Sequence, residues 1–250
     1  MAVKRSHSGS RILAVFDAVA ANQPIGVSAL ARLLDDDKSA IQRALMTLAD
    51  EGWIRASSEP PTRWEVTAHI LALAYAAYGS DDLRRRARPV LERLRDETGE
   101  TVLLVVPDIH NFVIADVVES RQVLRMVPHV GDLVTARNTA TGRAMLPFMS
   151  DEQQLAMLGE AVDETLLAGF ETTRAYGYAV SEGEINAAAT NIAAPIFDVA
   201  KQAVAAIVVC GPRERFDASL HASVGRQLIN AAQELCTARV QATKARAPRV

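Results

Sequence analysis

Apolar residues recur at helical spacing between residues 37 and 51, which read DKSAIQRALMTLADE. Ile41, Leu45 and Leu48 stand at positions i, i+4 and i+7, which form one stripe of an α-helix. The pattern therefore predicts a helix that buries this stripe and ends at Gly52. The opposite, polar side of this helix carries five residues, namely Lys38, Ser39, Gln42, Arg43 and Thr47.

Two shorter helices and a hairpin are predicted around this helix. Ser10 is a candidate N-cap for a helix that runs to about Ala21, and Ser28 begins a second helix, SALARLL. Residues 53–55 and 63–66 alternate like strands on either side of the Pro-rich loop SSEPPT, which predicts a hairpin. The order helix, helix, turn, helix, hairpin predicts a winged helix-turn-helix domain over residues 1–68.

The periodicity changes twice after residue 68. Residues 69–98 keep helical spacing and are predicted to form a helical linker, with Pro89 expected to kink or restart it. From Gly99 onward strands are predicted at 101–106, 112–118 and 122–127, and again at 177–180, 192–197 and 203–209. Helical patterns cover about 139–176 and 217–239.

Runs of strands separated from blocks of helices indicate the α+β class. Residues 99–241 are therefore predicted to form a domain with a mainly antiparallel sheet flanked by helices. Residues 242–250, which include the basic string KARAPRV, are predicted to be a flexible tail.

Composition indicates a soluble globular protein, because 49% of the 250 residues are hydrophobic and 23% are charged. The longest nearly apolar run, 70–78, is far shorter than the roughly 20 residues that cross a bilayer, so we expect no membrane span. Asp17 interrupts the first apolar stretch, which argues against a signal peptide and for a cytoplasmic protein. Cys210 and Cys236 are too few for a disulfide framework and are expected to be reduced and packed.

The charge balance restricts the possible partners. A formal net charge of −3 argues against nonspecific coating of nucleic acid, which requires a basic surface. Residues 1–65 contain eight basic and eight acidic residues, so site-specific DNA binding requires the two signs to be segregated. We expect Asp50 and Glu51 at the far end of the 37–51 helix. Six basic residues are expected on the N-terminal arm, the helix front and the hairpin, namely Lys4, Arg5, Arg11, Lys38, Arg43 and Arg63.

The 37–51 helix carries the side chains that a DNA major groove recognises. Gln42 can pair with adenine, Arg43 or Lys38 with guanine, and Ser39 can hold a phosphate near the helix N-terminus. The alternative is an ordinary solvated helix face. The predicted DNA-binding residues are Lys4, Arg5, Ser10, Arg11, Ser28, Lys38, Ser39, Ala40, Gln42, Arg43, Thr47 and Arg63.

Catalytic and metal-binding patterns are scarce in this sequence. The five histidines are scattered without metal-ligand spacing, and no G-x-G-x-x-G, P-loop or G-x-S-x-G string occurs. Cys210 could serve as a nucleophile, although a small packed residue is the more common role for such a cysteine. We therefore expect no catalytic residue, no metal and no cofactor.

Six strings, in the same order along nearly the whole chain, resemble those of one protein family: KSAIQRALMTLADEGWI, TGETVLLVVPD, TATGRAMLPFM, YGYAVSEGE, NIAAPIFD and AAIVVCGP. The chain resembles the IclR family of bacterial transcriptional regulators. In that family a winged helix-turn-helix precedes a GAF-like effector-binding domain.

The resemblance implies that a small organic acid, aromatic or short-chain, binds between the sheet and the TATGRAM segment. Four of the implied pocket residues can also be plain core, namely Met126, Ala140, Val208 and Cys210. Arg137 departs from the family pattern; our hypothesis places its positive charge at the pocket mouth for a carboxylate, and the alternative is an exposed loop arginine. The effector-binding candidates are Met126, Arg137, Ala140, Thr141, Ser181, Asn191, Val208 and Cys210.

The sequence thus predicts a DNA-binding transcriptional regulator that recognises a palindromic operator as a homodimer or tetramer and responds to a small organic acid. Two alternatives stay open at this point. One is an enzyme acting on a small acid, with the winged helix as an oligomerisation or protein-interaction module. The other is a winged helix that contacts another protein instead of DNA.

Overall fold

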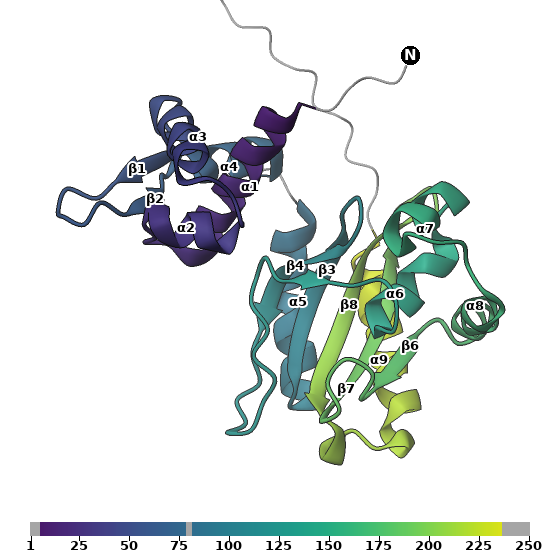
Figure 1. Ribbon diagram of the computed structural model, residues 1–250. Helices are drawn as coiled ribbons and strands as arrows, with labels where there is room; N and C mark the ends of the chain where they lie inside the picture. Colours follow the sequence, from purple (N-terminus) through teal and green to yellow (C-terminus); the bar gives the residue numbers. More distant parts are fainter. Residues whose placement is uncertain (1–5, 79–81, 237–250) are drawn as a thin grey trace, which may run out of the picture. The chain divides into compact units, whose positions relative to one another are not determined.

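The computed structural model describes residues 6–78 and 82–236, which form two compact units (Figure 1). The first unit comprises Met1–Asp81 and the second Asp82–Val250. Among the described residues, no helix combines the length and apolar character needed to span a membrane. Lys4, Arg5 and the predicted tail at 242–250 lie outside the described residues.

The first unit is a winged helix-turn-helix followed by one more helix. Its elements are α1 (His7–Asn22), α2 (Val27–Leu33), α3 (Lys38–Asp50), β1 (Ile54–Ala56), β2 (Trp64–Val66) and α4 (His69–Tyr78). The strands β1 and β2 pair antiparallel, with Arg55 opposite Glu65. The predicted order of elements is confirmed.

The apolar stripe of α3 forms the centre of this unit. Ile41 and Leu45 are fully buried and Leu48 is almost so, as the spacing predicted. They pack in one cluster with Val15 and Val19 of α1, and with Leu30, Ile54 and Trp64. Gly52 follows the helix with a φ of 77°, a left-handed conformation that glycine adopts without strain.

The predicted N-cap of the first helix is wrong. Ser6 is the N-cap of α1, because its side chain accepts a hydrogen bond from the amide of Gly9. Ser10 lies inside the helix and is exposed. Residues 6–10 offer three serines, and apolar periodicity that starts at Ile12 does not distinguish among them.

The second unit is built on one six-stranded sheet. Its strands are β3 (Thr101–Pro107), β4 (Phe112–Val118), β5 (Leu133–Val134), β6 (Ala179–Glu182), β7 (Ala189–Phe197) and β8 (Ala203–Pro212). Their order across the sheet is β5-β4-β3-β8-β7-β6, and every neighbouring pair is antiparallel. The α+β class and the antiparallel sheet are therefore confirmed.

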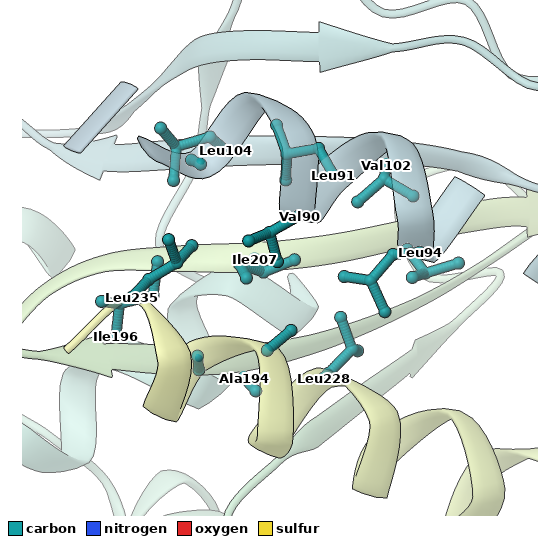
Figure 2. Close-up of a cluster of buried hydrophobic side chains, with 14 of the residues drawn as sticks. Val90, Leu91, Leu94, Val102, Leu104, Ala194, Ile196, Ile207, Leu228 and Leu235 are labelled. Carbon is teal, nitrogen blue, oxygen red and sulfur yellow. The ribbon is translucent and has the colours of Figure 1, made fainter. Parts of the chain in front are cut away.

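Two long helices, α5 (Asp82–Thr98) and α9 (Ala218–Glu234), cover one face of this sheet. Figure 2 shows Val90, Leu91 and Leu94 of α5 meeting side chains of the strands and Leu228 of α9. The other face is covered by α6 (Ala140–Met145), η1 (Leu146–Phe148), α7 (Asp151–Leu158) and α8 (Glu164–Tyr176). A short helix η2 (Arg213–Arg215) follows β8.

The region predicted as a linker at 69–98 is divided between the two units. The helix α5 runs without interruption through Pro89, so the predicted restart at that residue is wrong. Ala87, Val90 and Leu91 are buried against the sheet. A proline inside a helix removes one hydrogen bond, and burial of this apolar stripe offsets that loss.

The strand predicted at 122–127 is also wrong. These residues form no strand, and Leu133–Val134 pairs with β4 in their place. Two carbonyls of the segment are instead bound by side chains: that of Met126 by Thr101 and that of Leu124 by Arg215. Alternation of apolar and polar residues predicts which side chains would face each side of a strand. It does not supply the neighbouring strand that a sheet requires.

Candidate functional site

The N-terminal turn of α3 presents a polar surface on a capped helix. Asp37 is the N-cap and accepts a hydrogen bond from the amide of Ala40 at 3.0 Å. Lys38, Gln42 and Arg43 are exposed. Ala40 is only 6% exposed and packs inward, so the prediction that it contacts DNA is wrong.

Hydrogen bonds along the front of α3 link its polar side chains. The Ser39 hydroxyl donates to the carboxylate of Asp37, and Arg43 Nη1 donates to Ser39 Oγ at 3.3 Å. The bond from Ser39, followed by that from the Ala40 amide, lowers the pKa of Asp37 below its ordinary value. The Ser39 proton that was predicted to hold a phosphate is therefore already engaged within the helix.

The charges around α3 are only partly segregated. Asp50 and Glu51 lie at its far end, as expected. The acidic turn 35–37, however, stands at the N-terminal end of α3, where DNA reading was predicted. Asp36 is bound there by Arg11, with 2.5 Å between Arg11 Nε and Asp36 Oδ2.

The remaining predicted DNA-binding residues of this unit are spread over its surface. Ser28 and Thr47 are exposed, and Thr47 Oγ1 donates to the carbonyl of Arg43. Arg63 stands at the end of the hairpin loop and donates from Nη1 to the carbonyl of Pro24 at 3.2 Å.

In the second unit, a row of four polar side chains crosses the face of the sheet that α6 covers. Ser181 pairs with Asn191, Asn191 with Cys210, and Cys210 with Thr101, so the row runs through β6, β7, β8 and β3. Side chains two residues apart in a strand share one face, and Val208 packs on the α6 side. Three of the predicted effector residues are thus brought together as lateral neighbours.

The next row on the same face is apolar. Ala179, Ala193, Val208 and Leu103 pair laterally in the same strand order. Three of these side chains are small, and all four are buried in the cluster that the covering helices complete. The face therefore offers hydrogen-bonding groups beside a short apolar surface.

Thr101 was missed by the sequence analysis. Its hydroxyl donates to the carbonyl of Met126 at 2.8 Å and accepts from the amide of Ser120 at 3.1 Å. The first of these bonds attaches the backbone of Met126, a predicted effector residue, to the end of the polar row. The sequence contained a signal for this position. Thr101 precedes the inward-facing Leu103 by two residues, so both side chains lie on the same face of the strand.

The helix α6 closes over this face and carries two further candidates. Its N-cap Thr139 accepts from the amide of Gly142 at 3.0 Å, and Ala140 and Thr141 are buried. A Cβ on Gly142 would lie 1.8 Å from the carbonyl oxygen of Ala136, so only glycine allows this close approach. The helix is thereby held tightly to the loop that precedes it.

Cys210 is a buried, neutral thiol. Burial, with a smaller contribution from Glu100, raises its pKa to about 12. A thiol with this pKa is not a nucleophile near neutral pH, which supports the packed role over the catalytic one. Cys236, in contrast, is exposed, so the expectation that it is packed is wrong.

Arg137 is held by two carboxylates. Arg137 Nη2 lies 2.7 Å from Glu160, and Nη1 lies 3.1 Å from Asp163 Oδ2. Asp163 is also the N-cap of α8, and hydrogen bonds from the Leu166 amide and then from Arg137 lower its pKa. Arg137 therefore ties the start of α8 to the loop before α6.

Three clefts of the second unit lie elsewhere. One, about 460 Å³, is lined by residues that include Pro107, Ile109 and Met157, and a second, about 270 Å³, by residues that include Glu100 and Arg215. The third, about 210 Å³, lies beside Arg95 and Arg121. Within the described ranges, no group of three or more histidine, cysteine or carboxylate side chains could hold a metal.

Comparison with protein families gives two matches that together cover most of the chain. Residues 9–58 match the IclR helix-turn-helix domain, and residues 75–237 match the C-terminal domain of the bacterial transcriptional regulator IclR. The chain belongs to the IclR family of bacterial transcriptional regulators. As a member of this family, it is a DNA-binding regulator of transcription.

Relatives within the IclR family match over most of their length. The HTH-type transcriptional regulator BhcR of Paracoccus denitrificans is 29% identical over 236 residues, which are 90% of this chain and 84% of that protein. The acetate operon repressor of Salmonella typhimurium is 27% identical over 230 residues, covering 87% and 84%. These relatives are regulators and not enzymes, which removes support for the enzyme alternative.

Solved structures of transcriptional regulators have the same fold. A transcriptional regulator from Rhodococcus sp. RHA1 aligns with a TM-score of 0.72 at 25% identity, covering 92% of this chain and 97% of that one. IclR of Thermotoga maritima aligns with a TM-score of 0.68 at 22% identity, covering 91% and 96%.

Proposed function

We propose that this regulator binds a palindromic operator as a homodimer or tetramer, and that a small organic acid bound on the α6 face of the sheet changes its affinity for DNA. The observation that carries the DNA part is the exposed front of α3, with Lys38, Gln42 and Arg43 on a capped helix. The polar row through Asn191 and Cys210 supports the effector part.

The DNA interface that we propose is centred on α3. The major groove admits one helix and presents a different hydrogen-bonding pattern for each base pair. Gln42 and Arg43 would then read bases, and Lys38 would contact a base or phosphate. Ser10, Ser28, Thr47 and Arg63, together with Lys4 and Arg5 of the N-terminal arm, are proposed to contact the backbone.

Oligomerisation is part of this proposal for a geometric reason. One winged helix covers only a half-site, so useful affinity and specificity require at least two copies. A symmetric dimer would present two α3 helices about one DNA turn, or a multiple of it, apart, which a palindrome matches.

The effector site that we propose lies between the sheet and α6. A small acid with one polar end and a short apolar part would match the polar row beside the apolar row. Its carboxylate would meet neutral hydrogen-bonding groups, because Arg137 already binds Glu160 and Asp163. The proposed contacts are Met126, Ala140, Thr141, Ser181, Asn191, Val208 and Cys210.

Binding of DNA can be tested with the promoter region of the regulator's own gene, by fluorescence anisotropy at several salt concentrations. Arg43→Ala should weaken binding by at least about fivefold, because a good bidentate base contact contributes about 1–3 kcal/mol. The matched control is Arg93→Ala, an exposed arginine of α5 paired with Glu234. Unchanged affinity for Arg43→Ala, or binding that is independent of salt, would favour a protein partner over DNA.

Binding of the effector can be tested by thermal shift with a panel of small organic acids, since a ligand of the native state raises its melting temperature. Asn191→Ala should abolish the shift produced by the best acid. Asn230→Ala, on the exposed side of α9, should retain it. Isothermal titration with Arg137→Ala then decides the role of that residue, because unchanged affinity would remove it from the site.

A further inference from the structure

Arg11 and Asp36 join α1 to the turn in front of α3. Arg11 Nε donates to Asp36 Oδ2 at 2.5 Å, across 25 positions of sequence. Both side chains are partly buried, with exposed fractions of 39% for Arg11 and 27% for Asp36. The Arg11 side chain is therefore partly packed against the domain and does not extend freely into solvent.

Asp36 is bound on several sides within the turn. Its other carboxylate oxygen accepts from the amide of Asp37 at 2.7 Å, and its own amide donates to the carbonyl of Ala31 at 3.1 Å. The preceding residue, Asp35, has a φ of 48°, a conformation that costs energy in residues other than glycine. The hydrogen bond from Arg11, followed by that from the Asp37 amide, holds the pKa of Asp36 below its ordinary value.

This turn determines where α3 begins. Asp37 is the N-cap of α3, and Lys38 is its first residue. A change in the backbone at residues 35–37 would therefore shift the exposed side chains that read DNA. A carboxylate near DNA phosphates is electrostatically unfavourable. The presence of Asp36 in the turn before the N-terminal end of α3 therefore requires another role.

We propose that Arg11 acts on DNA binding as a positioning residue, which fixes the α2–α3 turn through Asp36, and not as a phosphate contact. The proposal rests on the DNA-binding function of the first unit. It predicts that Arg11 and Asp36 act as one unit, whereas a phosphate contact would act without Asp36.

The two roles predict opposite effects of Asp36→Asn on operator affinity. If Arg11 positions the turn, Arg11→Gln and Asp36→Asn should each weaken operator binding by about fivefold, the scale of a partly exposed ion pair. The double variant should be no weaker than either single variant. If Arg11 contacts a phosphate, Asp36→Asn should leave binding unchanged or tighten it, because the variant removes a negative charge.

Salt dependence gives a second readout. The slope of log affinity against log salt should be unchanged in Arg11→Gln, while loss of a phosphate contact would reduce it by about one. The matched control is Arg93→Gln, which removes an ion pair of 2.6 Å to Glu234 in the second unit. Additive losses, a reduced slope, or wild-type affinity in both single variants would each overturn the proposal.

Amide hydrogen exchange tests the same idea without DNA. Exchange at Ala40 and Ile41, whose amides bond to Asp37, should accelerate in Arg11→Gln and in Asp36→Asn. Unchanged exchange in both variants would overturn the positioning role even if no operator were bound. Failure of the wild-type protein to bind DNA, with accelerated exchange in the variants, would contradict the proposed function alone.

Discussion

The exposed polar surface of α3 and the polar row of the sheet are assembled in different ways. Lys38, Gln42 and Arg43 come from one helix, and two buried residues between them set their direction. Thr101 and Cys210 are lateral neighbours although they stand near opposite ends of the second unit's sequence. The first surface is defined by local spacing, and the second exists only when the sheet has formed.

This difference predicts how the two surfaces respond to damage. A change in the sheet core should affect the proposed effector site and leave the helix-turn-helix folded, because each unit has its own hydrophobic cluster. A change in α3 should have the opposite effect. The variants below test this separation, in order of decreasing expected effect.

Leu104→Ala and Leu45→Ala form the strongest pair, because both leucines are fully buried, one in each unit. Each variant should lose about 2–5 kcal/mol of unfolding free energy. Urea denaturation followed by hydrogen exchange with mass spectrometry would assign the loss to one unit. If Leu104→Ala also opened α1 and α3, the two units would not be energetically separate.

Gly142→Ala tests the contact between α6 and its preceding loop. The added Cβ would overlap the carbonyl oxygen of Ala136, so the loop must move, at a cost of about 1–3 kcal/mol. We expect a lower melting temperature and a weaker response to the best small acid, with promoter binding unchanged in the absence of that acid. Gly169→Ala in α8, whose Cβ meets no atom within 4 Å, serves as the control.

Asp37→Ala should have the smallest effect and should be confined to the first unit. The variant removes the N-cap of α3 and the partner of Ser39, so promoter binding should weaken modestly and α3 should fray. Circular dichroism and anisotropy would measure both. Ser150→Ala, which removes the N-cap of α7 in the second unit, is the matched control.

The same carboxylate predicts a dependence on pH. The pKa of Asp37 is lowered from 3.8 in the folded protein, so its stabilising contribution is complete above that value. The contribution is lost as pH falls through the lower, folded pKa. Asp37→Ala should therefore show a smaller loss of stability than the wild-type protein on acidification below about pH 4. An identical acid response would show that the cap does not contribute.

Apolar spacing within single helices predicted most of the first unit. The wrong predictions there also concerned single positions within a helix. The stripe of Ile41, Leu45 and Leu48 gave the helix and its direction, whereas three nearby serines left the N-cap of α1 undetermined. Ala40 was counted among the DNA contacts, but it is buried. It stands four residues before the buried Ala44, on the same side of α3.

In the second unit, the errors came from contacts that periodicity does not contain. Residues 122–127 alternate like a strand but have no neighbouring strand, and their carbonyls bind side chains of Thr101 and Arg215 instead. Pro89 was expected to interrupt a linker because the burial of α5 against the sheet was not visible in the pattern.

The amino-acid sequence by itself determined the order of elements, the α+β class, the exposed polar face of α3 and, through six family strings, the family. These features depend on spacing within single elements or on the order of motifs. Only the tertiary structure decided that Thr101 joins Ser181, Asn191 and Cys210, that Arg137 binds two carboxylates, and that Arg11 binds Asp36. Such contacts depend on which distant segments the hydrophobic cores bring together, and charge or periodicity along the chain does not specify that choice.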